Sequence, residues 1–280
     1  MGSHNTQTVL ITGASSGIGA AFARKLAAQG YDLILVARRE AKLKQLTTLL
    51  QTQFHVKVEA LVADLCELAD IERVEKHITE ITNLDLLVNN AGFGDPGNFA
   101  ENSLAQTQAL INLHIIATTR LSHAALPTMI ARHSGAIINV SSIASFIPNP
   151  PIEIIYCATK AYLNTFSEGL QAQLQLQGAQ VRIQALCPGF TFTEFHDNSA
   201  YESQQIKTRI PKWLWMSAEE VVEKSLQNLK HGRVIYIPGF KNRIIVALAR
   251  SRVVCSLAIA FCNRLSSRNI LGSKNSLPRP

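Results

Sequence analysis

The chain has 280 residues, of which 47% are hydrophobic and 17% charged, a composition that supports a full core and excludes intrinsic disorder, collagen and coiled coils. Its net charge is +7, but residues 224–280 hold eleven Lys and Arg and no acidic residue, so residues 1–223 are acidic overall. An acidic main body argues against a nucleic-acid-binding protein. The sequence has no apolar run of about 18 residues, no secretory signal and no zinc-ligand spacing among its five cysteines, so we expect a cytoplasmic protein with reduced thiols and no metal.

Short β-branched runs alternate with longer segments of helical periodicity. Thr8–Thr12 is typical of a buried strand, whereas Ile18, Phe22 and Leu26 recur at the four-residue spacing of a helix. The predicted strands are 8–12, 33–37, 56–63, 85–89, 136–141, 181–186 and 234–237. The predicted helices are 17–30, 40–54, 67–81, 103–132, 153–177 and 218–230.

Strands separated by helices require right-handed crossovers, which favour a parallel sheet between two helical layers. No repeat or interdomain linker interrupts this pattern. The sequence therefore predicts an α/β fold: one Rossmann-type domain over residues 1–240, a doubly wound parallel sheet of about seven strands with helices on both faces. Residues 241–280 form a basic helical extension.

A glycine-rich turn, TGASSGIG (12–19), joins the first predicted strand to a helix. Gly13 permits the tight turn, Gly17 lets the backbone approach a pyrophosphate, and Gly19 allows close packing of helix and sheet. The helix N-terminus offers free amide groups to the anion. The loop, including Ser15, Ser16 and Ile18, is thus predicted to bind a dinucleotide; a purely structural turn is the alternative.

The end of the second predicted strand indicates which dinucleotide binds. Sites that prefer NAD usually carry an acid there for the ribose 2′-hydroxyl, but this chain has Ala37, followed by Arg38 and Arg39. Guanidinium groups bind a phosphate through a planar fork of donors. We therefore predict NADP(H) as the cofactor, with a solvated basic loop as the alternative.

Tyr156 and Lys160 lie four residues apart on a predicted helix, so their side chains share a face. A free tyrosine has a pKa near 10, and a nearby ammonium group would lower it. Proton transfer is most effective when the pKa lies near the working pH. The two residues are therefore a candidate acid–base pair, and an ordinary surface pair is the alternative.

Six motifs resemble, in order, those of the short-chain dehydrogenase/reductase family. They are TGASSGIG (12–19), NNAG (89–92), Asn112, Ser142, the YCATK that holds Tyr156 and Lys160, and PGFTFT (188–193). The resemblance spans about residues 6–240. VARREAKL, NNAGFGDPGNF and CPGFTFTEF are most similar to bacterial members related to 17β-hydroxysteroid and long-chain 3-oxoacyl reductases.

The resemblance implies roles for single residues. Tyr156 would protonate the carbonyl oxygen as hydride arrives from the nicotinamide, and Lys160 would also hold the nicotinamide ribose. Ser142, in preference to Ser141, would hydrogen-bond the substrate oxygen, and Asn112 would hold a water that connects Lys160 to solvent. Further implied cofactor contacts are Asp64 (a helix N-terminal acid is the alternative), Leu65, Asn90, Ala91, Gly92, Pro188, Gly189, Thr191 and Thr193.

Two features depart from close relatives. Fourteen residues separate Ser142 from Tyr156, where thirteen are common, and the extra one falls in the proline-rich segment 147–154. We expect the catalytic geometry to survive and the pocket wall to change. His114 lies near Asn112, and we expect a core histidine with a satisfied hydrogen bond rather than a catalytic one.

The resemblance also implies a variable substrate loop within the domain, over residues 190–217. This segment is rich in large apolar side chains, and such walls suit a hydrophobic ligand. We therefore predict a ketone with an apolar body, fatty-acyl or steroid-like, as the small-molecule substrate; ordinary lid packing is the alternative. The residues concerned are Phe190, Phe192, Phe195, Tyr201, Ile210, Trp213, Leu214, Trp215 and Met216, with Phe93, Phe146, Ile147 and Pro148 as possible neighbours.

The residue pattern of the basic extension predicts an imperfect amphipathic helix. Arg243, Arg250 and Arg264 fall on a seven-residue grid, interrupted by Leu257 and with Arg252 opposite. Its apolar face could pack on the domain, on a second subunit or on an anionic membrane surface. The resemblance implies a homodimer or homotetramer.

The sequence thus predicts an NADP(H)-dependent carbonyl reductase. The direction rests on the family-level expectation that NADP(H) pools are reduced. Two alternatives stay open: an oxidative, NAD-dependent alcohol dehydrogenase, and a nucleotide-binding or membrane-recruited protein without turnover.

Overall fold

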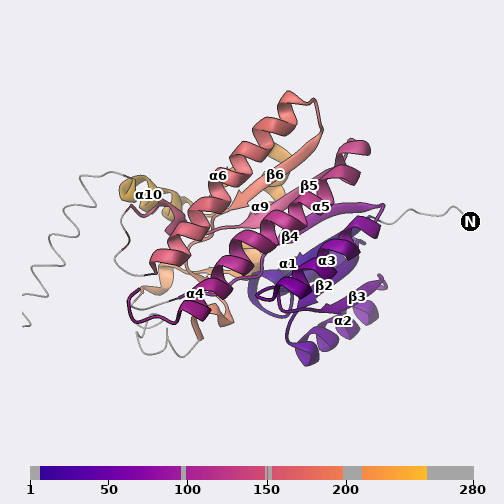
Figure 1. The fold of residues 1–280 in the computed structure, drawn as a ribbon, viewed down its shortest axis with the longest axis horizontal. Helices are drawn as coiled ribbons and strands as arrows, with labels where there is room; N and C mark the ends of the chain where they lie inside the picture. Colours follow the sequence, from indigo (N-terminus) through magenta and orange to yellow (C-terminus); the bar gives the residue numbers. More distant parts are fainter. Residues whose placement is uncertain (1–6, 96–98, 149, 151–152, 198–209, 251–280) are drawn as a thin grey trace, which may run out of the picture.

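The computed structural model describes residues 7–95, 99–148, 150, 153–197 and 210–250. All seven predicted strands form and join one parallel sheet in the order β3-β2-β1-β4-β5-β6-β9 (Figure 1). The order reverses between β1 and β4, and ligands of such sheets bind outside the carboxyl ends of strands at this point. The strands are β1 (Thr8–Thr12), β2 (Asp32–Ala37), β3 (Val58–Val62), β4 (Leu84–Asn89), β5 (Gly135–Val140), β6 (Val181–Leu186) and β9 (Ile235–Tyr236).

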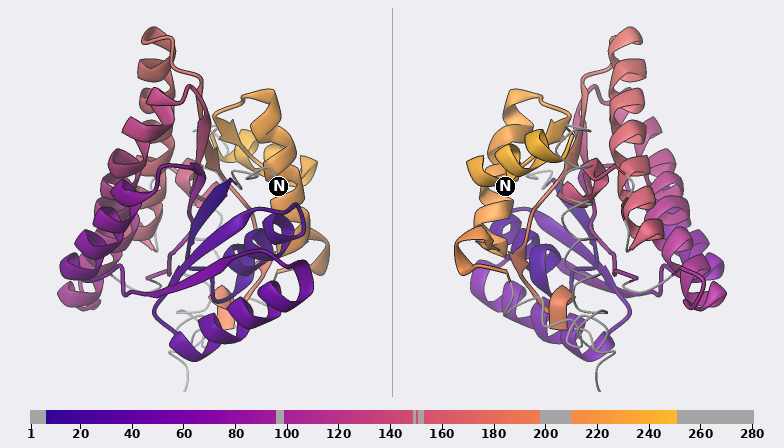
Figure 2. Two further views of the ribbon diagram at one scale, coloured as in Figure 1. Left: turned by 90° about the vertical axis from the view of Figure 1, so that its right-hand side faces the viewer. Right: turned by 90° about the vertical axis from the view of Figure 1, so that its left-hand side faces the viewer.

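Helices cover both faces of the sheet, as predicted (Figure 2). Val9 and Ile11 of β1 point into the core beneath one helical layer, and Leu10 points into the core beneath the other. A central parallel strand is therefore apolar throughout instead of alternating with polar residues. One layer holds α1 (Gly17–Ala27), α2 (Glu40–Phe54) and α9 (Ala218–His231). The other holds α3 (Leu68–Glu80), α4 (Leu104–Ile111), α5 (Thr118–Ala131) and α6 (Ile154–Leu176).

The helix predicted over 103–132 is divided into three parts. Between α4 and α5, residues Asn112–Ala117 form a π-helical segment. Such segments often mark functional sites. Periodicity of apolar residues does not distinguish this widened turn from a continuous α-helix, which explains why the sequence predicted a single element.

The start of the C-terminal extension packs on the domain. Helix α10 (Phe240–Ala249) buries Asn242 and Val246, and the Arg250 guanidinium lies 4.9 Å from the ring centre of Phe146. Leu257, Arg252 and Arg264 lie outside the described residues. No helix within the described ranges is long and apolar enough to span a membrane.

Candidate active site

A cavity of about 570 Å³ lies at the carboxyl edge of the sheet. The loops that follow β1 to β6 all contribute to its lining, as expected at a topological switch point. It includes every predicted cofactor-binding residue except Gly19, together with Tyr156, Lys160 and Ser142, but not Asn112. The structure therefore brings nearly all the predicted site residues to one place, while their contacts with a cofactor stay predictions.

The glycine-rich loop is locked against the end of β4. The Thr12 hydroxyl oxygen accepts hydrogen bonds from the amides of Asn90 and Ala91, at 2.9 and 3.0 Å. A Cβ added to Gly13 would lie 2.7 Å from the Cα of Ala91, and one added to Gly19 would lie 2.5 Å from Nδ2 of Asn90. Gly13 also has a positive φ of 65°. The sequence did not single out Thr12, although it opens the glycine-rich motif.

We expect Gly19→Ala to destabilise the protein by about 2 kcal/mol, because overpacking a tight contact typically costs 1–3 kcal/mol. The methyl group would have to displace the Asn90 amide that ties the two loops together. Denaturant unfolding measures the effect. Gly169→Ala in α6 is the matched control, since nothing lies within 4 Å of its added Cβ. Equal midpoints for both variants would contradict the proposed contact.

Both predicted arginines lie at one end of the cavity. The Arg39 guanidinium donates to the hydroxyl oxygens of Ser16 and Ser15, at 2.7 and 2.9 Å, and pairs with Glu194 at 2.6 Å. The guanidinium nitrogen Nη1 of Arg38 lies 3.8 Å from the carboxylate oxygen Oδ2 of Asp64. This set of guanidinium and hydroxyl groups fits a phosphate.

Glu194 was not predicted as part of the site. Its carboxylate joins Lys42 as well as Arg39, both at 2.6 Å, and hydrogen bonds from these two cations lower its pKa to about 2. An anionic group is thus already stabilised beside Arg39. Only its position directly after the PGFTFT motif could have drawn attention to it.

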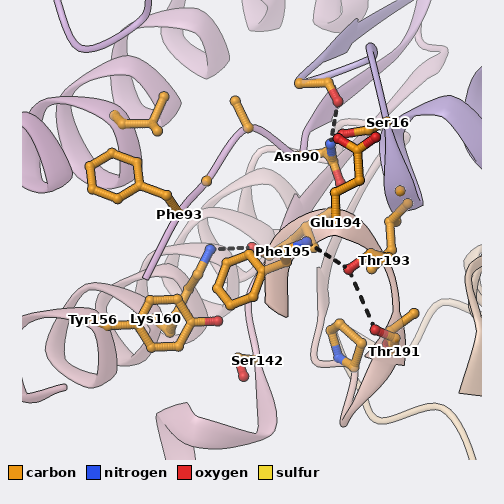
Figure 3. Close-up of a pocket in the computed structure, with 18 of the residues that line it drawn as sticks. Ser16, Asn90, Phe93, Ser142, Tyr156, Lys160, Thr191, Thr193, Glu194 and Phe195 are labelled. Carbon is orange, nitrogen blue, oxygen red and sulfur yellow. Dashed lines mark hydrogen bonds between the residues drawn. The ribbon is translucent and has the colours of Figure 1, made fainter. Parts of the chain in front are cut away.

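Tyr156, Lys160 and Ser142 gather at the other end of the cavity (Figure 3). The Lys160 ammonium donates to the carbonyl of Val140 at 2.8 Å and lies 5.6 Å from the centre of the Tyr156 ring. The Ser142 hydroxyl oxygen accepts from the amide of Ala144 at 3.1 Å, whereas the Ser141 hydroxyl donates to the carbonyl of Lys160 at 2.9 Å. Ser142 is therefore the serine placed to meet a substrate oxygen, and its role stays a prediction.

The ionisation of the pair differs from the prediction. Burial raises the pKa of Tyr156 above its ordinary value of 10.0, and the nearby Ser142 hydroxyl only partly opposes this rise. Burial also lowers the pKa of Lys160 to about 7. Both charged forms lose hydration in this site, and this loss is the largest cause of both pKa shifts. Tyr156 is consequently protonated at neutral pH.

The sequence drew attention to two residues of the π-helical segment. The Asn112 amide donates to the carbonyl of Cys66 at 2.9 Å and lies outside the cavity lining, so its water-holding role stays a prediction. His114 is buried, and its Nδ1 pairs with the Thr159 hydroxyl at 2.8 Å, which confirms the expected core histidine with a satisfied hydrogen bond. Its Nε2 has no partner among the described residues.

The wall beside Tyr156 is apolar. Phe195 lies 5.9 Å from Tyr156 between ring centres, and Ile245 of α10 reaches the cavity from the C-terminal extension, which the sequence did not predict. The carboxylate-bearing Glu153, in a left-handed conformation before α6, also lines the cavity. The apolar and aromatic lining consists of Ile18, Val36, Leu65, Phe93, Leu113, Val140, Ile143, Ala144, Ile147, Phe190, Phe195 and Ile245, with several small alanines.

Several of the predicted substrate residues pack elsewhere. Trp215 is buried against Phe190 and Phe192, with ring centres 5.5 and 5.0 Å apart, and Trp213 is exposed. Two short strands, β7 (Thr191–Phe192) and β8 (Met216–Ser217), hold this cluster together. Lid packing thus accounts for Trp215, whereas Trp213 lies outside the cavity lining. Phe192, Trp213, Leu214, Trp215, Met216, Ile210, Phe146 and Pro148 are absent from the lining, and Tyr201 lies outside the described residues.

Comparisons with known proteins agree with this geometry. The profile of the family described as short chain dehydrogenase matches residues 7–204. A solved short-chain dehydrogenase from Sphingobium yanoikuyae, in complex with NADPH, is similar over 98% of both chains, with a TM-score of 0.77 and 32% identity.

Two curated relatives match about two thirds of the chain. The very-long-chain 3-oxoacyl-CoA reductase of Anas platyrhynchos is 33% identical over 66% of this chain and 60% of its own length. The sulfoacetaldehyde reductase 2 of Chromohalobacter salexigens is 37% identical over 67% of this chain and 73% of its own. Within the described part of the chain, no three His, Cys, Asp or Glu side chains cluster as metal ligands would.

Proposed function

The chain belongs to the short-chain dehydrogenase/reductase family, and from that premise we propose that it is an NADPH-dependent reductase of apolar ketones. One observation carries the proposal. A single cavity is lined by Arg38 and Arg39 at one end, by the Ser142 and Tyr156 hydroxyl groups at the other, and by an apolar wall. These are the groups needed to bind a phosphorylated dinucleotide, to donate a proton and to hold a hydrophobic substrate.

Tyr156 and Ser142 act on the carbonyl oxygen. A bound nicotinamide supplies the hydride. Ser142 donates a hydrogen bond to the oxygen, where negative charge develops. The O–H bond of Tyr156 breaks as the new O–H bond of the alcohol forms, which leaves Tyr156 as a phenolate. The Lys160 ammonium stabilises that phenolate, and the site then regains its proton from water.

The ionisation state of Tyr156 supports the reductive direction. A protonated tyrosine is ready to donate, whereas oxidation of an alcohol requires the phenolate. Lys160 loses its charge as the pH rises through about 7 and then no longer stabilises the phenolate. We therefore expect kcat for reduction to fall as the pH increases from 7 to 9. A reductive kcat that rises over this interval would contradict the assignment.

The arginines and one relative support NADPH over NADH. Ala37 leaves no carboxylate at the end of β2, and Arg38 and Arg39 follow it. The Sphingobium yanoikuyae structure contains NADPH.

The cavity wall favours an apolar substrate, while the relatives span two classes. The long-chain 3-oxoacyl reductase acts on a largely apolar chain, and sulfoacetaldehyde is small and anionic. Each buried methylene contributes about 0.8 kcal/mol, so four more methylenes raise kcat/KM roughly two-hundredfold. Against NADPH, a decyl ketone, a cyclic ketone and a 3-oxodecanoyl thioester are compared with sulfoacetaldehyde. Preference for sulfoacetaldehyde would overturn the substrate class, and cofactor binding without turnover of any carbonyl would overturn the enzyme assignment.

A further inference from the structure

His114 is a buried side chain that none of the steps above uses. It lies in the π-helical segment and is 1% exposed. Its ring meets the Tyr156 ring edge-on, with 5.8 Å between centres. Burial, and to a lesser extent the nearby Lys160, hold the pKa of His114 well below 6.5, so the imidazole is neutral at pH 7.

The hydrogen bonds around Thr159 identify the tautomer. The Thr159 hydroxyl has one hydrogen, and it donates that hydrogen to the carbonyl of Tyr156 at 2.9 Å. Its oxygen must therefore accept the hydrogen bond from His114, so Nδ1 carries the imidazole proton. Nε2 is then a bare acceptor, buried and without a partner among the described residues.

Nε2 is directed at the part of the site that holds Lys160. A Cβ added to Gly92 would lie 2.8 Å from Nε2 of His114 and 3.6 Å from Nζ of Lys160. The two nitrogens are thus no further apart than the sum of these distances. Gly92 has no side chain to fill the region beside them. A buried acceptor without a hydrogen bond is costly, and buried waters usually satisfy such groups.

We propose that His114 is a positioning residue for the reduction: its Nε2 accepts a hydrogen bond from one water, which in turn accepts from the Lys160 ammonium. The water orients Lys160 and favours its charged form, the form that stabilises the Tyr156 phenolate. The proposal rests on the proposed function, because it concerns the acid–base pair of that reaction. A neutral histidine in the Nδ1–H form suits this position, since it offers only an acceptor on this side.

Other titratable groups act on the same pair. Glu153 before α6, Cys157 of α6 and Cys187 after β6 influence Tyr156, and Cys187 also influences Lys160. The loop after β4, residues 90–93, brings no charged side chain toward His114. All these groups stay unchanged in variants of His114, so a change in the pH profile reports the histidine itself.

Two substitutions separate the two ring nitrogens. His114→Asn keeps a donor for Thr159 and loses the acceptor at Nε2, whereas His114→Gln places an amide oxygen near the Nε2 position and loses the bond to Thr159. At high pH the reductive kcat falls, and we expect His114→Asn to lower the midpoint of this fall by about half a pH unit to one pH unit. A shift of this size corresponds to the free energy of one neutral hydrogen bond. At pH 8, kcat should fall about threefold to tenfold, with KM for the ketone unchanged. His114→Gln should recover most of the loss, and His123→Asn, at an exposed site on α5, should match the wild type.

A wild-type pH profile in His114→Asn would overturn the proposal. Equal shifts in both His114 variants would also overturn it, since they would indicate packing instead of hydrogen bonding. Thermal unfolding and NADPH titration show whether each variant is folded and binds. If neither the wild type nor any variant oxidises NADPH with any ketone, the proposed function fails.

A second readout does not depend on turnover. NMR of 15N-histidine-labelled protein without cofactor should show one histidine that stays neutral in the Nδ1–H form below pH 6.5, where a free imidazole becomes charged. Its signal should be missing in His114→Asn. A signal in the Nε2–H form, or one that titrates near pH 6.5, would overturn the proposal even in an active enzyme.

Discussion

Tyr156→Phe is expected to lower kcat for ketone reduction by about a thousandfold, within the range that general acid catalysis contributes. The variant removes only the hydroxyl that donates the proton to the substrate oxygen. Its ring still packs between His114 and Phe195, so folding and NADPH binding should stay close to those of the wild type. Stopped-flow and steady-state assays with the preferred ketone measure the loss.

Tyr162→Phe, on the same helix, is the matched control. Tyr162 stacks on Phe166, and its hydroxyl bonds Thr119 at 2.8 Å, so the same chemical change there removes one hydrogen bond outside the cavity. We expect its kcat to stay within about twofold of the wild type, since one such bond contributes only about 1 kcal/mol to stability. A Tyr156→Phe enzyme with more than a tenth of wild-type kcat would contradict the assignment of Tyr156 as the proton donor.

Replacing both Arg38 and Arg39 by Gln should weaken NADPH binding by about a hundredfold and change NADH binding less than threefold. Hydrogen bonds to charged groups contribute about 1.5–3 kcal/mol each, and both side chains are partly solvated, so the lower end of that range applies. The two substitutions remove positive charge that only the 2′-phosphate of NADPH is expected to need. Titrations of both cofactors by energy transfer from tryptophan test this.

Arg73→Gln is the control for a general loss of positive charge. Arg73 bonds Asp70 and the carbonyl of Val62 at the surface and does not line the cavity. Its loss should leave both cofactor affinities unchanged. If the double variant binds NADPH as well as the wild type does, the two arginines are only a solvated loop, and the NAD-dependent oxidative alternative gains support.

Local sequence patterns predicted the sheet and most of the cavity lining. The central strands are apolar on both faces, so short apolar runs in the sequence were enough to predict them. The glycine-rich turn after the first strand could also be recognised from consecutive residues alone. The helical spacing of Tyr156 and Lys160 is equally local. The carboxyl edge of a parallel sheet then collects the loops, so residues distant in sequence could be assigned to one site.

Features that depend on tertiary contacts were not predicted. The Glu194–Arg39 ion pair joins residues 155 positions apart, and Ile245 reaches the cavity only because α10 folds back on the domain. The pKa of Tyr156 was expected to fall and instead rises, because burial cannot be read from an i, i+4 spacing. The tryptophans were assigned to the substrate by composition alone, whereas Trp215 packs with its own loop.

Hydride transfer itself can be followed with NADPH deuterated at nicotinamide C4. The purified protein is incubated with this cofactor and the preferred apolar ketone, and the product is analysed by mass spectrometry. NADPH is deuterated on one face of C4 in one experiment and on the other face in a second. With the face from which the enzyme transfers hydride, we predict one deuterium on the carbinol carbon of the alcohol for each NADPH oxidised. With Tyr156→Phe we predict none within the same reaction time. NADPH that binds tightly while no ketone or aldehyde acquires deuterium from either face would contradict a role in carbonyl reduction.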